Sequence, residues 1–392
     1  MVGDLTHLPV NWIDGMKISR KHFEETEYFI HEQVRDGAAK QITDFNFGIL
    51  PAEKSFDLSV SCDFSQQINI ELKACKAITP NGSRIQILPE DAIKVITNFK
   101  SIAVKFGLQS AQSQNLYIVL SVNLFKRMPA GEPMMEESPP RHPFTQPELK
   151  LDVIPAEQIN TGKLADSLVI GKITFQNGEL LFQKDFIPSC TAVYSLPVLM
   201  EWYSRFRQHL DSWELYCIKI VQKINSKTQT QQPNSLANSI QKLSEKILEQ
   251  LVLQKLYFQW IIPTSAPIFF CGMLLKNIHY LNTVVLCYTE KDREEMLNYF
   301  AEWTDVQAGT IENQTLKALQ LQYNHYDIQS VLMEINQVYT AYIQIFLKLS
   351  QLEFIGKRKG QNIFVIEQEV KETKQSAPPS TEKPNSRWSP LS

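Results

Sequence analysis

A cluster of histidine and acidic side chains near the N-terminus has the residue types of a metal site. Glu27 and His31 are four residues apart and therefore share one face of a helix, with His22, Glu24 and Glu25 just before them. Imidazole and carboxylate groups are the ligands that zinc prefers after thiolates. No second segment carries a matching pattern, however, so a solvated helix face is the better interpretation.

A second polar cluster comprises Tyr323, His325 and Asp327. Aspartate and histidine together could serve as general acid and base. No nucleophile lies beside them in the sequence, and Asp327 stands where a helix is expected to begin. The helix dipole favours a carboxylate there, so we interpret this cluster as a set of hydrogen bonds at a helix start.

Recurrent catalytic and nucleotide-binding motifs do not occur in the chain. There is no GxxxxGK[ST], GxGxxG, GxSxG or HExxH pattern. Lys and Arg total 39 against 42 Asp and Glu, a net charge of -3, which gives no electrostatic reason to expect nucleic acid. The sequence therefore predicts an assembly protein rather than an enzyme, with no metal, cofactor or nucleic-acid partner.

The composition is that of a globular protein of two or three domains, with 392 residues of which 43% are hydrophobic. Its six cysteines form no CxxC pair, which predicts reduced thiols in a cytosolic protein. The stretch from Tyr257 to Leu275 is uncharged over 19 residues but contains Pro263 and Pro267. A helix broken there would leave backbone groups unsatisfied in lipid, so we predict a buried helical corner and no direct membrane insertion.

The first 188 residues have the period-two pattern of strands. Gln67–Ala74 alternates, and Asn81-Gly82 and Asn177-Gly178 provide the positive φ angles of tight hairpins. One helix is expected before the strands, over about Arg20–Gln41, with Ser19 as its N-cap. Six prolines between Arg127 and Pro147 predict a long surface loop. We predict a β-rich, sandwich-like domain over 1–188.

From Leu196 the apolar period changes to about 3.5 residues, which predicts a helical bundle over 189–352 and an α+β protein overall. Further helices are expected from Leu236, after Ser265, after Thr289, and over Ile328–Leu352. Bulky residues in the first seam favour a wide bundle or association with copies of the chain. The seam comprises Leu199, Tyr203, Phe206, Leu210, Trp213, Cys217, Ile220 and Ile224.

The last part of the chain, 353–392, has a different composition. Asn362–Ile366 has the pattern of a short strand, whereas Thr373–Ser392 holds four prolines and almost no aliphatic residues. Such a tail buries too little surface to offset its ordering entropy, so we predict disorder. Trp388 is its one large apolar residue and a candidate docking residue for a partner.

Five segments of the chain have a recognisable order and spacing: Val10–Phe23, Asn46–Ile49, Asp185–Pro188, Leu196–Leu199 and Tyr323–His325. Together they resemble the TssK family, the trimeric baseplate subunits of type VI secretion systems. The most specific segment is the first, with its Trp, acidic residue and Gly-Met followed by His-Phe. The others are similar to the family's aromatic-Gly segment, its Phe-Ile-Pro, its entry into the helical part and its Tyr-x-His.

The resemblance implies a β-rich shoulder, a helical neck that holds a trimer, and a structural role linking the TssF–TssG wedge to a membrane complex of TssJ, TssL and TssM. It implies a location at the cytoplasmic face of the inner membrane. Phe23 and Phe47 are expected to pack in the core, because buried aromatics usually stabilise cores, and the glycines to meet backbone demands. The motif positions, as wedge contacts or core, are Trp12, Gly15, Met16, His22, Phe23, Phe47 and Gly48.

The chain departs from the family pattern in length, because only 40 residues follow Leu352. That is less than the roughly 50 residues of a small domain, so a reduced C-terminal head is expected, with the tail and Trp388 as an alternative contact to the membrane complex. Two other classes remain open. One is a phage-like tail or receptor-binding protein of a contractile injection system, and the other is an enzyme using one of the two histidine clusters.

Overall fold

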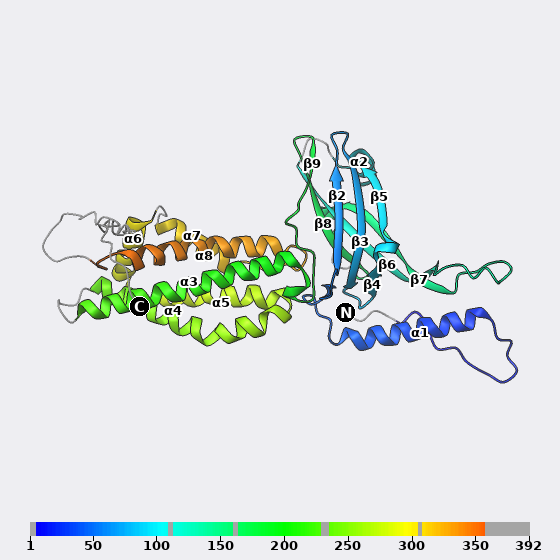
Figure 1. The fold of residues 1–392 in the computed structure, drawn as a ribbon, viewed down its shortest axis with the longest axis horizontal. Coiled ribbons are helices and arrows are strands. Elements are labelled where there is room, and N and C mark those ends of the chain that lie inside the picture. The colour runs from blue at the N-terminus through cyan, green and yellow to red at the C-terminus, as the bar shows by residue number, and fades with distance from the viewer. Residues whose placement is uncertain (1–4, 109–112, 160–163, 229–234, 305–307, 357–392) are drawn as a thin grey trace, which may run out of the picture.

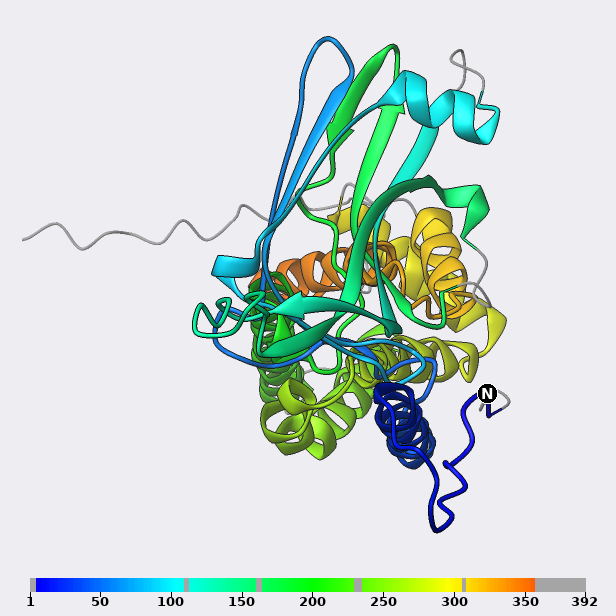
Figure 2. The ribbon, with the colours of Figure 1, turned by 90° about the vertical axis from the view of Figure 1, so that its right-hand side faces the viewer.

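The computed structural model describes residues 5–108, 113–159, 164–228, 235–304 and 308–356. A sheet-rich part is followed by an elongated helical bundle, which extends from one end of the sheets (Figure 1). In Figure 2 the bundle lies behind the sheets. The α+β architecture predicted from the sequence is confirmed. The predicted strand at 362–366 and the tail with Trp388 lie outside the described residues.

The sheet-rich part contains two antiparallel sheets. The first is centred on β3, which pairs with all four of its neighbours, and the second has the order β7-β6-β8-β9. The first sheet comprises β1 (Gly48–Ile49), β2 (Phe56–Cys62), β3 (Gln67–Ile78), β4 (Arg84–Ile87) and β5 (Ile93–Asn98). The second comprises β6 (Gln114–Ala130), β7 (Phe144–Pro155), β8 (Ser167–Gln176) and β9 (Glu179–Phe182).

The predicted alternation and hairpins are present. Ile68, Ile70 and Leu72 of β3 are buried in the core shared by the two sheets. Gly82 (φ 81°) and Gly178 (φ 86°) have the positive φ angles expected in the turns from β3 to β4 and from β8 to β9. The local sequence therefore sets both the register and the turns of these strands.

The prediction of a loop over the whole of Arg127–Pro147 is wrong, because the loop is shorter. Strands β6 and β7 continue into it as a two-stranded ribbon, in which Arg127 is opposite Pro147 and Ala130 is opposite Phe144. Each strand of such a ribbon has a free edge, so a proline that lacks an N–H need not remove a ladder hydrogen bond. The loop that remains is Gly131–Pro143.

Most helices lie where the sequence placed them. Helix α1 (Arg20–Ala39) has Ser19 as its N-cap, and Thr289 caps α6 by accepting a hydrogen bond from the Asp292 N–H. The helices α2 (Phe99–Phe106) and α7 (Ala308–Leu319) were not predicted. The bundle comprises α3 (Pro197–Thr228), α4 (Ser235–Trp260), α5 (Pro267–Leu286), α6 (Glu290–Trp303), α7 and α8 (Ile328–Gln351). The predicted domain boundary at 188/189 falls between β9 and α3.

The predicted corner between α4 and α5 contains the 3-10 turn η5 (Ile262–Thr264). Ser265 does not cap α5, because its hydroxyl donates backward to the Ile261 carbonyl at 2.8 Å and the helix begins at Pro267. By length and composition α5 could cross a membrane, but 44% of its most apolar window is buried in the bundle. Its Asn277 donates to the Tyr339 hydroxyl of α8 at 2.9 Å, as expected of a core helix.

The heptad seam of α3 packs inside a single chain. Seven of its eight residues are buried and Leu210 is partly buried. The Tyr203 ring stacks on Phe258 of α4 at 4.7 Å, and Trp213 meets Tyr339 of α8 at 5.7 Å. The chain's own helices therefore cover this surface, which fits the wide bundle rather than the association with copies of the chain. Heptad spacing requires an apolar partner but does not specify which chain provides it.

Candidate interaction surfaces

The acidic residues of the first predicted cluster are each paired separately. Glu24 pairs with Arg20 at 2.7 Å, Glu25 with His7 at 3.2 Å, and Glu27 with Arg127 of the ribbon. Among the described residues, no group of three or more His, Cys, Asp or Glu side chains could hold a metal ion. Glu25 attaches the N-terminal segment to α1, and Glu27 attaches α1 to the ribbon, whereas the Glu24 pair lies within the helix.

The two histidines of that cluster have different surroundings. The His22 Nδ1 accepts a hydrogen bond from the Ser19 N–H at 3.2 Å, which closes a capping box at the start of α1. His31 is exposed on the helix surface. The first cluster is thus a capped and largely solvated helix face.

The second cluster forms a buried hydrogen-bond chain between the bundle and the sheets. The Tyr323 hydroxyl donates to His325 Nδ1 at 2.8 Å, and His325 Nε2 lies 2.9 Å from the Phe47 carbonyl oxygen. A carbonyl only accepts, so the proton of the neutral ring is on Nε2. Burial of the ring lowers the pKa of His325 to about 4. Asp327 caps α8 by accepting from the Ser330 N–H at 3.2 Å, as predicted for a helix start.

Gly48 brings a third segment to the same place. Its φ is +109°, and a Cβ built on it would lie 2.0 Å from the Ser189 carbonyl oxygen. Ser189 in turn donates from its hydroxyl to the His325 carbonyl at 2.8 Å. We call Phe47, Gly48, Ser189 and His325 the joint. Phe47 is 1% exposed and packs in the core, and the backbone at Gly48 leaves no room for a side chain.

The other motif aromatics are on the surface. Trp12 is 49% exposed and Phe23 is 58% exposed, with their ring centres 6.4 Å apart. The expectation that Phe23 packs in the core is wrong. Helix α1 turns a different side to the ribbon, where the Tyr28 hydroxyl donates to the Phe125 carbonyl at 3.0 Å.

Helix α1 leaves an apolar stripe in solvent. Ile30 and Val34 are exposed and follow Phe23 at steps of seven and four residues, so the three share one side of the helix. Of the residues of α1, all of them described, only Glu32 is buried, where it accepts from the Thr6 and His7 N–H groups. We call Trp12, Phe23, Ile30 and Val34 the α1 face. Exposed stripes of this kind mark contact sites.

Gly15 and Met16 shape the segment that precedes α1. Gly15 has a φ of +77° with no described atom within 4 Å of a Cβ built on it, and the Met16 N–H donates to the Ile13 carbonyl at 3.3 Å. Gly15 thus meets a backbone demand, as expected. The turn returns the chain toward α1 and brings Trp12 against its first turn.

A second apolar surface lies at the corner between α4 and α5. Leu253, Leu256 and Trp260 follow one another at steps of three and four residues on the outer side of α4. Sequence reasoning assigned no function to them, although apolar positions broaden toward Leu256 and Trp260. The corner patch comprises Val252, Leu253, Leu256, Tyr257, Trp260, Ile261 and Phe269, which are between 44% and 78% exposed.

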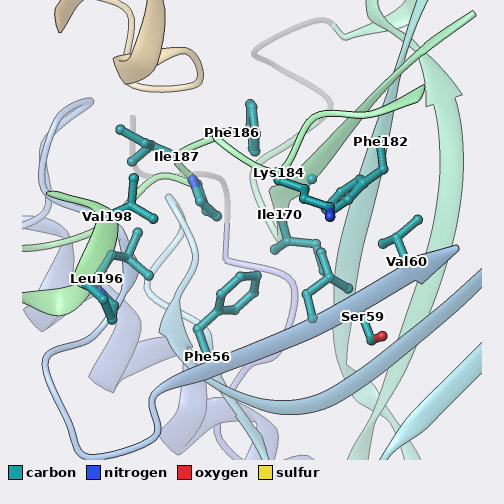
Figure 3. A pocket seen from close by; sticks show the side chains of 14 residues that line it. Phe56, Ser59, Val60, Ile170, Phe182, Lys184, Phe186, Ile187, Leu196 and Val198 are labelled. Carbon is teal, nitrogen blue, oxygen red and sulfur yellow. The ribbon is translucent and has the colours of Figure 1, made fainter. Parts of the chain in front are cut away.

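A groove of about 420 Å³ opens between the sheets where they meet the bundle (Figure 3). Apolar side chains such as Phe56, Val60 and Phe182 line it, and Lys184 is the charged residue among its described walls. No described His, Asp or Glu lines it, so these walls provide no pair for acid–base chemistry. The groove offers apolar contact.

No family model matches the sequence, and no curated protein matches it. The chain is similar in fold to solved structures of TssK. A crystal structure of TssK is 13% identical, with 86% of this chain and 69% of that chain covered and a TM-score of 0.45. A cryo-electron microscopy structure of a type VI secretion TssK-TssF-TssG baseplate subcomplex contains a chain 12% identical, with 86% and 100% covered and a TM-score of 0.47. A chain of another type VI baseplate complex is 13% identical, with 87% and 100% covered and a TM-score of 0.46.

Proposed function

We propose that this protein is a non-enzymatic adaptor of a type VI secretion baseplate. The observation that carries the proposal is the exposure of Trp12 and Phe23, the two aromatic residues of the opening motif. A motif aromatic needed for folding would be buried, as Phe47 is. An exposed one fits a role in assembly, because aromatic side chains dominate the binding energy of protein interfaces.

The α1 face is the contact for a wedge protein of the TssF or TssG type. Those are the proteins assembled with TssK in the baseplate subcomplex described above. Phe23, Ile30 and Val34 provide an apolar stripe for which the described part of the chain supplies no cover. Lys17, Lys21 and other exposed polar residues surround it, as in the polar rim of an interface.

The protein associates as a trimer through the corner patch. The buried α3 seam has no free surface, whereas the outer side of α4 repeats the spacing of three and four that suits contact between helices. From Leu256 to Leu275 the sequence is uncharged, so this part of the corner patch can meet a copy without burying a charge.

The other end of the adaptor faces the membrane complex. We assign this contact to the C-terminal tail with Trp388, and we place the assembly at the cytoplasmic face of the inner membrane. Binding of a purified membrane-complex protein to the chain with and without residues 373–392 tests the assignment. Equal binding would contradict it.

The proposal as a whole is tested by mixing the purified chain with purified TssF- and TssG-like proteins. We expect a stable complex by size-exclusion chromatography with light scattering, and at least tenfold weaker binding for Phe23→Asp, which places a charge in an apolar contact. Val104→Asp is the control, since Val104 is also an exposed apolar residue (79% against 58% for Phe23) but lies on α2. No binding by the intact chain, or equal loss in both variants, would refute this function.

A further inference from the structure

The ribbon formed by the ends of β6 and β7 projects from the sheets on the same side of the molecule as α1 (Figure 1). We include in the ribbon the loop Gly131–Pro143 that joins its two strands. The ribbon carries four large apolar side chains in solvent, Met128, Met134, Met135 and Phe144, which are between 40% and 78% exposed. Methionine is flexible and polarisable and is frequent at surfaces that adapt to a partner. The ribbon thus has the composition of a contact element.

The end of the ribbon is held by its own hydrogen bonds. The Met134 N–H donates to the Arg141 carbonyl at 2.8 Å, and Arg141 pairs with Glu137. The His142 Nδ1 lies 2.7 Å from the Gly131 carbonyl oxygen, to which it donates as the N–H tautomer. Pairing of Ala130 with Phe144 closes the ladder below them. The ordering entropy of these residues is therefore lost on folding rather than on binding.

The charge at this end selects the kind of partner. Glu132 and Glu136 are exposed, and neither forms an ion pair within the described part of the chain. Anionic lipid and nucleic acid both repel carboxylates, so these side chains disfavour a membrane or a nucleic acid. They fit a protein surface whose apolar area is flanked by Lys or Arg.

The base of the ribbon contacts α1 on the side of the helix that lies next to the α1 face. Arg127 of β6 pairs with Glu27, one turn from Phe23, and the Arg127 guanidinium lies 5.0 Å from the Tyr28 ring centre. The Tyr28 and Phe125 rings meet edge to face at 5.2 Å. Figure 2, which looks along α1, shows that the outer ends of the helix and the ribbon stand apart. Both elements lie on the same side of the molecule in Figure 1, so one partner can contact both.

We propose that the β6–β7 ribbon is a second contact element for the wedge protein, binding an apolar surface flanked by basic residues. This inference rests on the function proposed above and adds to it the chemistry of the partner surface. The methionines and Phe144 supply apolar contact, and Glu132 and Glu136 supply charge-assisted contacts. Both come in addition to the α1 face.

The test shortens the ribbon without disturbing the sheet. An Asn-Gly turn replaces Gly131–Pro143 and joins Ala130 to Phe144, which already lie opposite each other. The probe is the purified wedge subcomplex of TssF- and TssG-like proteins, and the readout is its dissociation constant. We expect about tenfold or greater weakening, with an unchanged thermal unfolding midpoint.

A charge variant separates the acidic residues from the length of the ribbon. Glu132→Lys with Glu136→Lys should weaken binding about tenfold and reduce its salt dependence. Glu53→Lys with Glu179→Lys makes the same charge change at exposed positions outside the ribbon and should have little effect.

The possible outcomes separate the two proposals. If the intact chain binds the wedge and the shortened ribbon binds equally well, the ribbon proposal is overturned while the adaptor function stands. If the shortened chain keeps full wedge affinity but loses self-association, the ribbon contacts a second copy and the proposal is also overturned. If the intact chain does not bind the wedge, both proposals fail.

Discussion

At the scale of single residues, His325 and Gly48 join two parts of the chain that are far apart in sequence. His325 bonds to the Phe47 carbonyl across 278 positions, and Gly48 passes against the Ser189 backbone where no side chain fits. Neither role can be read from local sequence. His325 lies in a polar cluster whose residue types could serve catalysis as well as hydrogen bonding. The sequence around Gly48 does not show which distant backbone packs against it.

Replacement of Gly48 by alanine should be strongly destabilising. The new Cβ would overlap the Ser189 carbonyl and the backbone would keep a positive φ, so we expect a loss of about 3 kcal/mol or more in the free energy of unfolding. Urea denaturation measures it. Gly272→Ala is the control, because Gly272 is exposed in α5 with no described atom within 4 Å of the added Cβ, and it should be neutral or stabilising. Equal effects would contradict the described geometry of the joint.

The pH dependence of stability should report His325. In the folded chain the pKa of His325 is about 4, whereas the ordinary pKa of a histidine is 6.5. As the pH falls, the imidazole is therefore protonated in the unfolded chain before it is protonated in the folded chain. The contribution is therefore complete above pH 6.5 and decreases toward pH 4, by at most about 3 kcal/mol. Urea denaturation of the native protein and of His325→Gln between pH 7 and pH 4.5 compares the two slopes. A variant slope as steep as the native one would show that other groups dominate; His209, whose pKa burial also lowers, is one of them.

At the scale of elements, the bundle has one apolar surface in its interior and another in solvent. The α3 seam contacts α4 and α8, while the corner patch on α4 and α5 remains exposed. The two surfaces should respond differently to substitution. A change in the seam affects folding of the single chain, and a change in the corner patch affects association.

Leu256→Asp should dissociate the trimer proposed above without unfolding the chain. Leu256 is exposed in the single chain, so we expect the free energy of unfolding to change by less than about 1 kcal/mol while light scattering shows a monomer. Leu215→Asp on α3 tests an equally exposed leucine outside the patch and should leave the oligomer intact. An oligomer that persists in Leu256→Asp would place the contact elsewhere.

Trp213→Ala is the complementary change inside the seam. Removal of this buried ring should cost about 3–5 kcal/mol of stability, measured by thermal or urea unfolding. Any loss of the oligomer should follow the loss of folded protein. Dissociation of a fully folded variant would contradict the intrachain packing of the seam.

The elements themselves could be predicted well from the sequence, but their partners could not. The steps of four and three in α3 gave its position, and Asn-Gly gave two hairpins, because both signals are local. Pro129 and Pro147 indicated a loop, yet they lie in a ribbon whose open edges tolerate them. Phe23 was expected in the core because it is aromatic, but the sequence does not show which side of its helix the rest of the chain covers. Residue type and spacing determine an element, whereas its neighbours depend on the packing of the whole chain.

At the scale of the whole molecule, the sheets and the bundle meet through the joint and share one apolar core. The main cluster of buried residues runs from Phe47 and β3 through Leu199 and α8 without interruption. The two parts should therefore unfold together. Scanning calorimetry of the native protein should show one transition with equal calorimetric and van't Hoff enthalpies. Two transitions in the native protein would contradict a shared core.

The joint connects the sheets to one end of the bundle through buried hydrogen bonds, so a rotation of the sheets would displace the far end of the bundle. Helix α8 starts at the joint and has 24 residues, so its far end lies about 36 Å from the pivot. A tilt of the sheets by about 5° would displace that end by about 3 Å, because the rigid helices transmit the rotation undiminished. A force applied to α1 or the ribbon would therefore turn the helical bundle about the joint, and the far end of the bundle would move farther than residues close to the joint.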